Sequence, residues 1–180
     1  MKKICLIVFL FISVNTFASY ILIPMDAESQ KNHLKAYGIT YWILEKDLKV
    51  KWLLNYRGGS FLLPDAEEIQ RECQIRGVSF EVISNAKAES ILEEISSPSQ
   101  NMEAVVLEKA PKIAVYTPKG KQPWDDAVTM VLTYAEIPYE TIYDEEVLND
   151  GLLLFDWLHL HHEDFTGQYG KFYRAYRPAA

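Results

Sequence analysis

Cysteine is scarce in this chain of 180 residues, which contains only Cys5 and Cys73. Cys5 falls in a segment that we expect to be cleaved off, so Cys73 would have no internal partner for a disulfide. The sequence therefore predicts a fold that gains no stability from disulfides, even in an oxidising compartment. Cys73 also lies in a predicted helix near acidic residues and outside any strand–turn–helix elbow, so we do not expect it to be a nucleophile.

Basic residues are outnumbered, because 18 Lys and Arg stand against 25 Asp and Glu, giving a formal net charge of −7. A negatively charged surface repels the phosphate backbone of nucleic acids at long range. We therefore expect no nucleic-acid partner. The composition is otherwise that of a globular protein, with no low-complexity segment, and the length suits one core better than two compact domains.

A long apolar segment of the kind that crosses a bilayer is missing from the N-terminus. Two lysines precede the short run ICLIVFLFISV, whereas a spanning helix needs about 20 apolar residues. Small residues at Thr16 and Ala18 fit cleavage by signal peptidase. We predict a signal peptide over residues 1–18 and a periplasmic or secreted mature chain over residues 19–180, with no stable membrane anchor after cleavage. An uncleaved N-terminal anchor is the alternative.

Strand and helix patterns alternate along the mature chain. The predicted strands cover residues 20–24, 51–56, 78–84, 112–117, 139–143 and 155–161. The predicted helices cover residues 26–45, 64–77, 86–95, 125–136 and 144–150. This order favours the α/β class, in the form of a doubly wound, mostly parallel sheet with helices on both faces.

The domain organisation follows from that order. We expect a single α/β domain with two half-sheets, residues 20–110 and residues 111–165. Residues 171–180, KFYRAYRPAA, show no strand pattern. We therefore expect the chain to be truncated at its C-terminus.

Ionisable residues gather where the last predicted strand ends, in the sequence LHLHHED. Open parallel sheets bind ligands beyond the carboxyl ends of their strands, so this segment is the leading candidate site. His161, His162 and Glu163 are candidate acid–base residues, because neighbouring imidazoles and carboxylates tune each other near neutral pH. Asp164 is a candidate ligand-binding residue. His159 and His161 can face one metal ion together, but this spacing is common and we predict no metal. Polar residues that only cap the sheet edge are the alternative.

Paired glycines follow the second predicted strand in the sequence RGGSF, which spans Arg57, Gly58, Gly59 and Ser60. Glycine permits a positive φ and lets backbone N–H groups turn toward an anion, while Arg57 can supply a planar fork of donors. The segment matches neither a dinucleotide-binding nor a Walker motif. A cradle for phosphate or carboxylate and an ordinary tight turn both remain open.

Two more segments are expected at the same sheet edge. TPKGKQPW follows a predicted strand, so Lys119 and Lys121 are candidate ligand-binding residues, with a solvated lysine loop as the alternative. Asp26 follows the first predicted strand and joins them. We expect a small polar or anionic ligand at this edge. No cofactor is predicted, and the sequence does not identify a protein partner.

Three strings carry a family resemblance: NHLKAYGITYWILEK, KWLLNYRGGSFLLPD and HLHHEDFTGQYGKFY. They resemble exported Bacteroidota proteins that are often labelled asparagine synthetase B and described as having a class I glutamine amidotransferase-like domain. The resemblance covers Tyr20 to about Tyr176 and implies a flavodoxin-like fold. It also implies a relation to glutamine chemistry.

The residues that such chemistry needs are not all present. An asparagine synthetase B has its cysteine nucleophile directly after the initiator methionine, where this chain has Lys2. A class I amidotransferase places a cysteine on a strand-to-helix elbow, and no such elbow occurs in these residues. We therefore predict an exported amidotransferase-like protein that binds a small ligand or a partner without a complete catalytic set. The alternative is a hydrolase or glutamine amidotransferase whose nucleophile lies beyond Ala180.

Overall fold

The structure of the protein is a computed structural model that describes residues 19–117 and 127–160. The predicted signal peptide, residues 1–18, lies outside the described residues. Within the described part, no helix is both long and apolar enough to cross a membrane.

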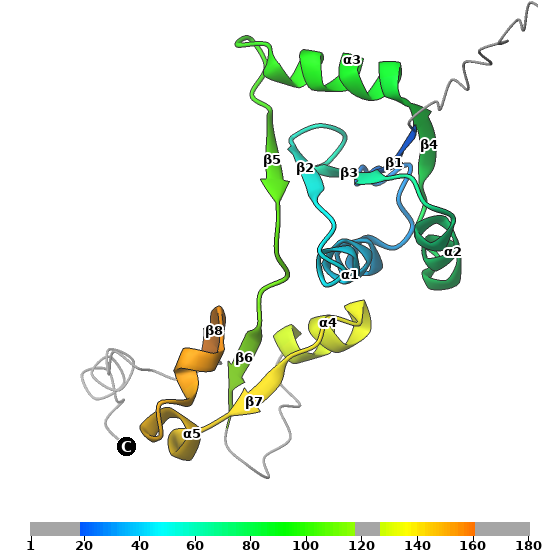
Figure 1. The fold of residues 1–180 in the computed structure, drawn as a ribbon. Helices are drawn as coiled ribbons and strands as arrows, with labels where there is room; N and C mark the ends of the chain where they lie inside the picture. The colour runs from blue at the N-terminus through cyan, green and yellow to red at the C-terminus, as the bar shows by residue number, and fades with distance from the viewer. Residues whose placement is uncertain (1–18, 118–126, 161–180) are drawn as a thin grey trace, which may run out of the picture.

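A five-stranded sheet is formed by the N-terminal half of the described chain (Figure 1). In spatial order its strands are β4 (Glu81–Ser84), β1 (Ser19–Ile23), β3 (Ser60–Pro64), β2 (Val50–Leu54) and β5 (Glu103–Leu107). Every neighbouring pair in this sheet is antiparallel. The prediction of a mostly parallel sheet is therefore wrong for this half.

Two strands that the sequence pattern did not reveal explain the error. SFLLP and EAVVL form β3 and β5, and both pair with β2. The RGGSF segment turns the chain directly from β2 back into β3. A tight turn joins antiparallel strands, whereas parallel neighbours need a crossover of a dozen or more residues. Once β2 and β3 form a hairpin, a doubly wound arrangement of this half is excluded.

Helices cover both faces of the antiparallel sheet, as the sequence predicted. They are α1 (His33–Leu44), α2 (Glu67–Arg76) and α3 (Asn85–Ser96). Successive side chains of a strand point to opposite faces. Ile21 and Ile23 of β1 therefore pack with α1 and α2, whereas Leu22 packs with Ala88 and Ile91 of α3.

The C-terminal half forms a separate three-stranded sheet, in which the predicted parallel pairing is found. Its strands lie in the order β7 (Glu140–Ile142), β6 (Ile113–Tyr116) and β8 (Trp157–Leu160). Its helices are α4 (Ala127–Ala135), α5 (Asp144–Leu148) and the 3-10 helix η1 (Gly151–Leu154). Both neighbouring strand pairs are parallel. Ile113 and Val115 of β6 pack with Leu132 of α4, which covers one face.

Helix packing, rather than strand pairing, connects the two sheets. α1 lies against α4, and the Tyr41 hydroxyl of α1 donates to the carbonyl oxygen of Pro111 at 2.7 Å, just before β6. Lys35 of α1 forms an ion pair with Glu136 at the end of α4. The protein is thus a mixed α/β structure. The two half-sheets that were expected within one sheet are instead a five-stranded sheet and a separate three-stranded sheet.

Candidate functional site

The carboxyl ends of β6 and β8 lie side by side, because the two strands are parallel neighbours with Tyr116 opposite Leu160. The strands that lead into the predicted lysine loop and the predicted histidine cluster therefore end at one common edge. Lys119 and Lys121 lie outside the described residues. The same is true of His161, His162, Glu163 and Asp164.

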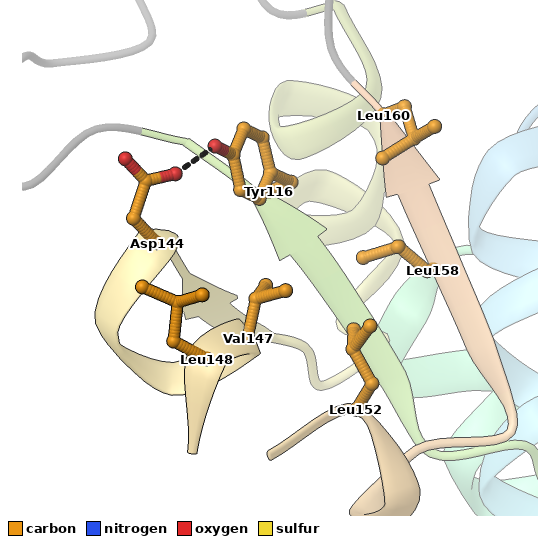
Figure 2. Close-up of a pocket in the computed structure, with 7 residues that line it drawn as sticks. All are labelled: Tyr116, Asp144, Val147, Leu148, Leu152, Leu158 and Leu160. Atoms are coloured by element: carbon orange, nitrogen blue, oxygen red, sulfur yellow. Dashed lines mark hydrogen bonds between the residues drawn. The ribbon is translucent and has the colours of Figure 1, made fainter. Parts of the chain in front are cut away.

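A pocket of about 400 Å³ lies next to this edge, between β6 and β8 on one side and α5 and η1 on the other (Figure 2). Tyr116, Leu158 and Leu160 share one sheet face, as their register requires. The pocket is lined by Tyr116, Asp144, Val147, Leu148, Leu152, Leu158 and Leu160. Its walls are therefore mainly aliphatic.

The polar end of the pocket is formed by two side chains. The hydroxyl of Tyr116 donates a hydrogen bond to the Asp144 carboxylate (Figure 2). The Tyr143 ring packs beside the Tyr116 ring, with centroids 5.1 Å apart. Asp144 also begins α5, whose first turn is acidic throughout. This end of the pocket can accept hydrogen bonds from a ligand, and its negative charge favours a ligand that carries N–H donors.

Sequence patterns did not single out these lining residues. Asp144 was predicted only as the first residue of the helix over residues 144–150, and Tyr116 only as part of the strand over residues 112–117. The two-residue period of β6 and β8 places Tyr116, Leu158 and Leu160 on one face once the strands are known to be neighbours. The missing information was the pairing of β6 with β8, which no local pattern contains.

Arg57 and Asp26, both predicted to bind a ligand, lie in contact with each other in the loops that follow β2 and β1 of the antiparallel sheet. The guanidinium Nε donates to Asp26 Oδ2 at 3.0 Å, and the two terminal nitrogens donate to Glu81 Oε1 at 2.8 Å and to Ser29 Oγ at 2.9 Å. Ser60, also a candidate, donates through its hydroxyl to the Arg57 carbonyl oxygen at 3.1 Å. Each guanidinium nitrogen thus has a protein acceptor.

These contacts shift the ionisation of both partners. The pKa of Asp26 is held below its usual value, mainly by hydrogen bonds from Ser29 and further by Arg57. The pKa of Arg57 is raised, first by its hydrogen bond to Glu81. The cluster therefore places one cation between two acidic side chains, which disfavours an added anion.

The paired glycines serve the turn between β2 and β3. Gly58 and Gly59 have φ angles of 78° and 92°, which are left-handed conformations that favour glycine. A β-carbon on Gly58 would lie 2.4 Å from the Met25 carbonyl oxygen, and the Met25 N–H donates to the Arg57 carbonyl oxygen at 3.0 Å. The geometry supports the tight-turn interpretation. The anion cradle stays a prediction with no contact in its favour.

The expectation that three segments and Asp26 meet at one parallel edge is wrong in two parts. RGGSF belongs to a hairpin of the antiparallel sheet, whereas β6 and β8 belong to the other sheet. The structure therefore brings together the strand ends that precede two of the three segments. The glycine pair lies apart from these two strand ends, and so does Asp26, because it follows β1 of the antiparallel sheet.

The cysteine of the described residues is not an activated nucleophile, and no metal cluster is found among them. Cys73 is buried in α2, and burial, with a smaller contribution from Glu72, raises the pKa of its thiol to about 12. The thiol is therefore neutral at physiological pH. Among residues 19–117 and 127–160, no group of three His, Cys, Asp or Glu side chains is arranged to hold a metal ion.

Comparison with protein-family models, with curated proteins and with solved structures finds no match to this chain. The resemblance to exported amidotransferase-like proteins therefore stays a prediction from the sequence.

Proposed function

We propose that this chain is an exported, glutamine amidotransferase-like protein that binds a small polar molecule at the carboxyl edge of its parallel sheet. The observation that carries the proposal is the pocket between α5 and the β6–β8 pair, with the Tyr116 and Asp144 side chains at its polar end. Export follows from the predicted signal peptide.

The strand order supports a flavodoxin-like character for the C-terminal half. In chain order, β6, β7 and β8 are the first, second and third strands of their sheet, and they lie in the order second, first, third. Flavodoxin-like sheets begin in this order and bind their ligand outside the carboxyl ends of the first and third strands, where the order reverses. In this protein that position is the edge between β6 and β8.

The pocket lining indicates the kind of ligand. Aliphatic walls from Leu148, Leu152 and Leu158 suit a short hydrocarbon chain, and the Asp144 carboxylate suits an amino or amide N–H group. An α-amino acid with an amide side chain has both features. L-Glutamine is therefore the first probe, and it is also the molecule that the family resemblance implies.

The proposal is binding rather than turnover because Cys73, the cysteine of the described residues, cannot act at this edge. Cys73, which would be the only cysteine after signal cleavage, is buried and neutral on the other sheet. The alternative is a hydrolase or glutamine amidotransferase that obtains its nucleophile from beyond Ala180. That alternative predicts release of ammonia and glutamate, whereas binding alone predicts none.

Isothermal titration of the mature chain, residues 19–180, with L-glutamine tests the proposal. We expect saturable binding without ammonia release, and Asp144→Asn should weaken it at least tenfold, or about 1.4 kcal/mol. Asp47→Asn is the matched control, because it replaces the same side chain in the same way at an exposed position in the turn between α1 and β2. Inorganic phosphate serves as the anionic probe.

Two results would contradict this function. Each probe is tested at concentrations up to about 10 mM, and a dissociation constant of this size corresponds to a binding free energy of roughly 3 kcal/mol. If neither probe binds in this range, the pocket is not a small-ligand site. If the chain releases ammonia from L-glutamine, the enzymatic alternative replaces the binding function.

A further inference from the structure

A second hollow, of about 200 Å³, lies where the two halves of the molecule meet. Its walls include Tyr37, Tyr41 and Leu44 of α1, Trp52 of β2, Phe61 of β3 and Ile137 after α4. It shares no lining residue with the pocket at the carboxyl edge. Any ligand here would touch the antiparallel sheet and the α4 end of the parallel unit at once.

Three of the four polar side chains that line this hollow are hydrogen-bonded within the protein, and the fourth, Tyr37, is half-exposed. The Trp52 indole N–H donates to the Gly59 carbonyl oxygen at 3.1 Å, and the Thr40 hydroxyl donates to the Ala36 carbonyl oxygen at 3.0 Å. The Tyr41 hydroxyl is bonded to the backbone just before β6. The inner surface is therefore almost wholly carbon. A polar ligand would lose hydrogen bonds to water without replacement, whereas an apolar ligand would not.

The aromatic walls form a corner. The Tyr37 and Phe61 rings meet edge to face, with centroids 5.5 Å apart and planes at 78°. The Trp52 and Phe61 rings are nearly parallel, at 24° and 6.1 Å. A further ring can therefore meet one wall with its face and the other with its edge, which are the arrangements that aromatic pairs prefer.

The volume sets the size of the occupant. An apolar protein cavity of roughly 150 Å³ holds a molecule the size of benzene. We propose that this hollow binds an uncharged aromatic compound of one ring or two fused rings. Recognition rests on ring packing, because the inner surface is almost wholly carbon. The site is independent of the function proposed for the carboxyl edge.

Indole and indene test the proposal, because indene has the shape of indole without the N–H donor. Saturation-transfer NMR and equilibrium dialysis with the mature chain measure binding of each. We expect both to bind, with indene at least as tight as indole, since an indole N–H would lose its hydrogen bond to water against an almost wholly carbon surface. L-Glutamine should not compete with either probe. Binding of indole alone would overturn the proposal, and so would binding of neither.

Two variants and one matched control localise the binding. Leu107→Trp fills the hollow from β5 and should weaken indene binding at least tenfold. Val106→Trp adds the same ring at the residue of β5 that precedes Leu107. Val106 is 48% exposed and points to the opposite face of the sheet, so the affinity for indene should be unchanged. Tyr37→Ala removes a half-exposed wall and should also weaken binding at least tenfold, so the test survives if the tryptophan variant fails to fold.

Unchanged affinity in both hollow variants would overturn the proposal. Sedimentation of the chain over a range of concentrations adds one more outcome. If indene affinity falls as the chain self-associates, the hollow belongs to a contact between two copies and the small-molecule proposal is wrong.

Discussion

A side chain on Gly38 would collide with the backbone of Ala135, because a β-carbon there would lie 1.8 Å from the Ala135 carbonyl oxygen. Gly38 is in the middle of α1 and Ala135 ends α4, so the two helices meet backbone to backbone. α1 belongs to the antiparallel sheet and α4 to the parallel sheet. The absence of a side chain at residue 38 therefore allows the two halves of the described structure to pack closely.

Gly38→Ala should destabilise the protein. Inside a helix this exchange normally stabilises by about 1 kcal/mol. In this position the added methyl group meets a carbonyl oxygen, and overpacking of this kind costs about 1–3 kcal/mol. Urea unfolding of the mature chain measures the net effect. A free energy of unfolding that rises with Gly38→Ala would show that α1 and α4 do not approach as described.

Gly58→Ala should cost more stability than Gly77→Ala. Both glycines have left-handed φ angles, 78° and 66°, where alanine costs about 1–2 kcal/mol. A β-carbon on Gly77 meets open space, whereas one on Gly58 would lie 2.4 Å from the Met25 carbonyl oxygen. The difference between the two variants isolates the close approach, and we expect it to be about 1–3 kcal/mol. Equal losses in thermal or urea unfolding would argue against this packing of the β2–β3 turn.

The elements that local pattern defines were predicted well from the sequence. Residues 20–24 and 112–117 contain strands, and α3 and α4 lie within a residue or two of the predicted helices. The topology was predicted only for the second half, because strand direction depends on which strands pair. The apolar run FLLP, which follows the glycine pair, is too short for its pattern alone to distinguish a strand from a loop. It is a strand because it pairs with β1 and β2.

The candidate site was predictable to a similar extent. The edge after β6 and β8 follows from the general behaviour of parallel sheets, and the structure brings these two strand ends together. Tyr116 and Asp144 were not predicted to meet, because their contact depends on how α5 folds back over the sheet face. Arg57 was predicted to bind an anion from its residue type and from the paired glycines that follow it. Its acidic neighbour Glu81 is 24 residues away and becomes visible only in the folded chain.

Acid should weaken the contact between α1 and α4 through Glu136. Its carboxylate accepts a hydrogen bond from Lys35 and lies 3.3 Å from the Arg76 guanidinium, and the Lys35 bond is the main cause that lowers its pKa. Because the folded pKa is lower, the unfolded chain binds more protons. The ion pairs of Glu136 therefore stabilise the fold fully above the usual Glu pKa of about 4.3, and this stabilisation is lost as the pH falls through the lower pKa of the folded state.

Glu136→Gln measures this contribution. The Glu136 side chain is 50% exposed and screened by solvent, so the effect at pH 7 should be no more than about 1 kcal/mol. The difference in free energy of unfolding between wild type and variant should shrink as the pH is lowered from 7 to about 3. A difference that stays constant or grows in acid would contradict the ion pair.

The most direct measurement of the proposed site is a titration of the ¹⁵N-labelled mature chain with L-glutamine, followed by amide chemical shifts. Binding at the carboxyl edge predicts saturable shifts at Tyr116, Asp144, Leu148 and Leu160, with the amide of Arg57 unchanged. Shifts that gather around Arg57 on the antiparallel sheet, while the β6–β8 edge stays unchanged, would contradict it.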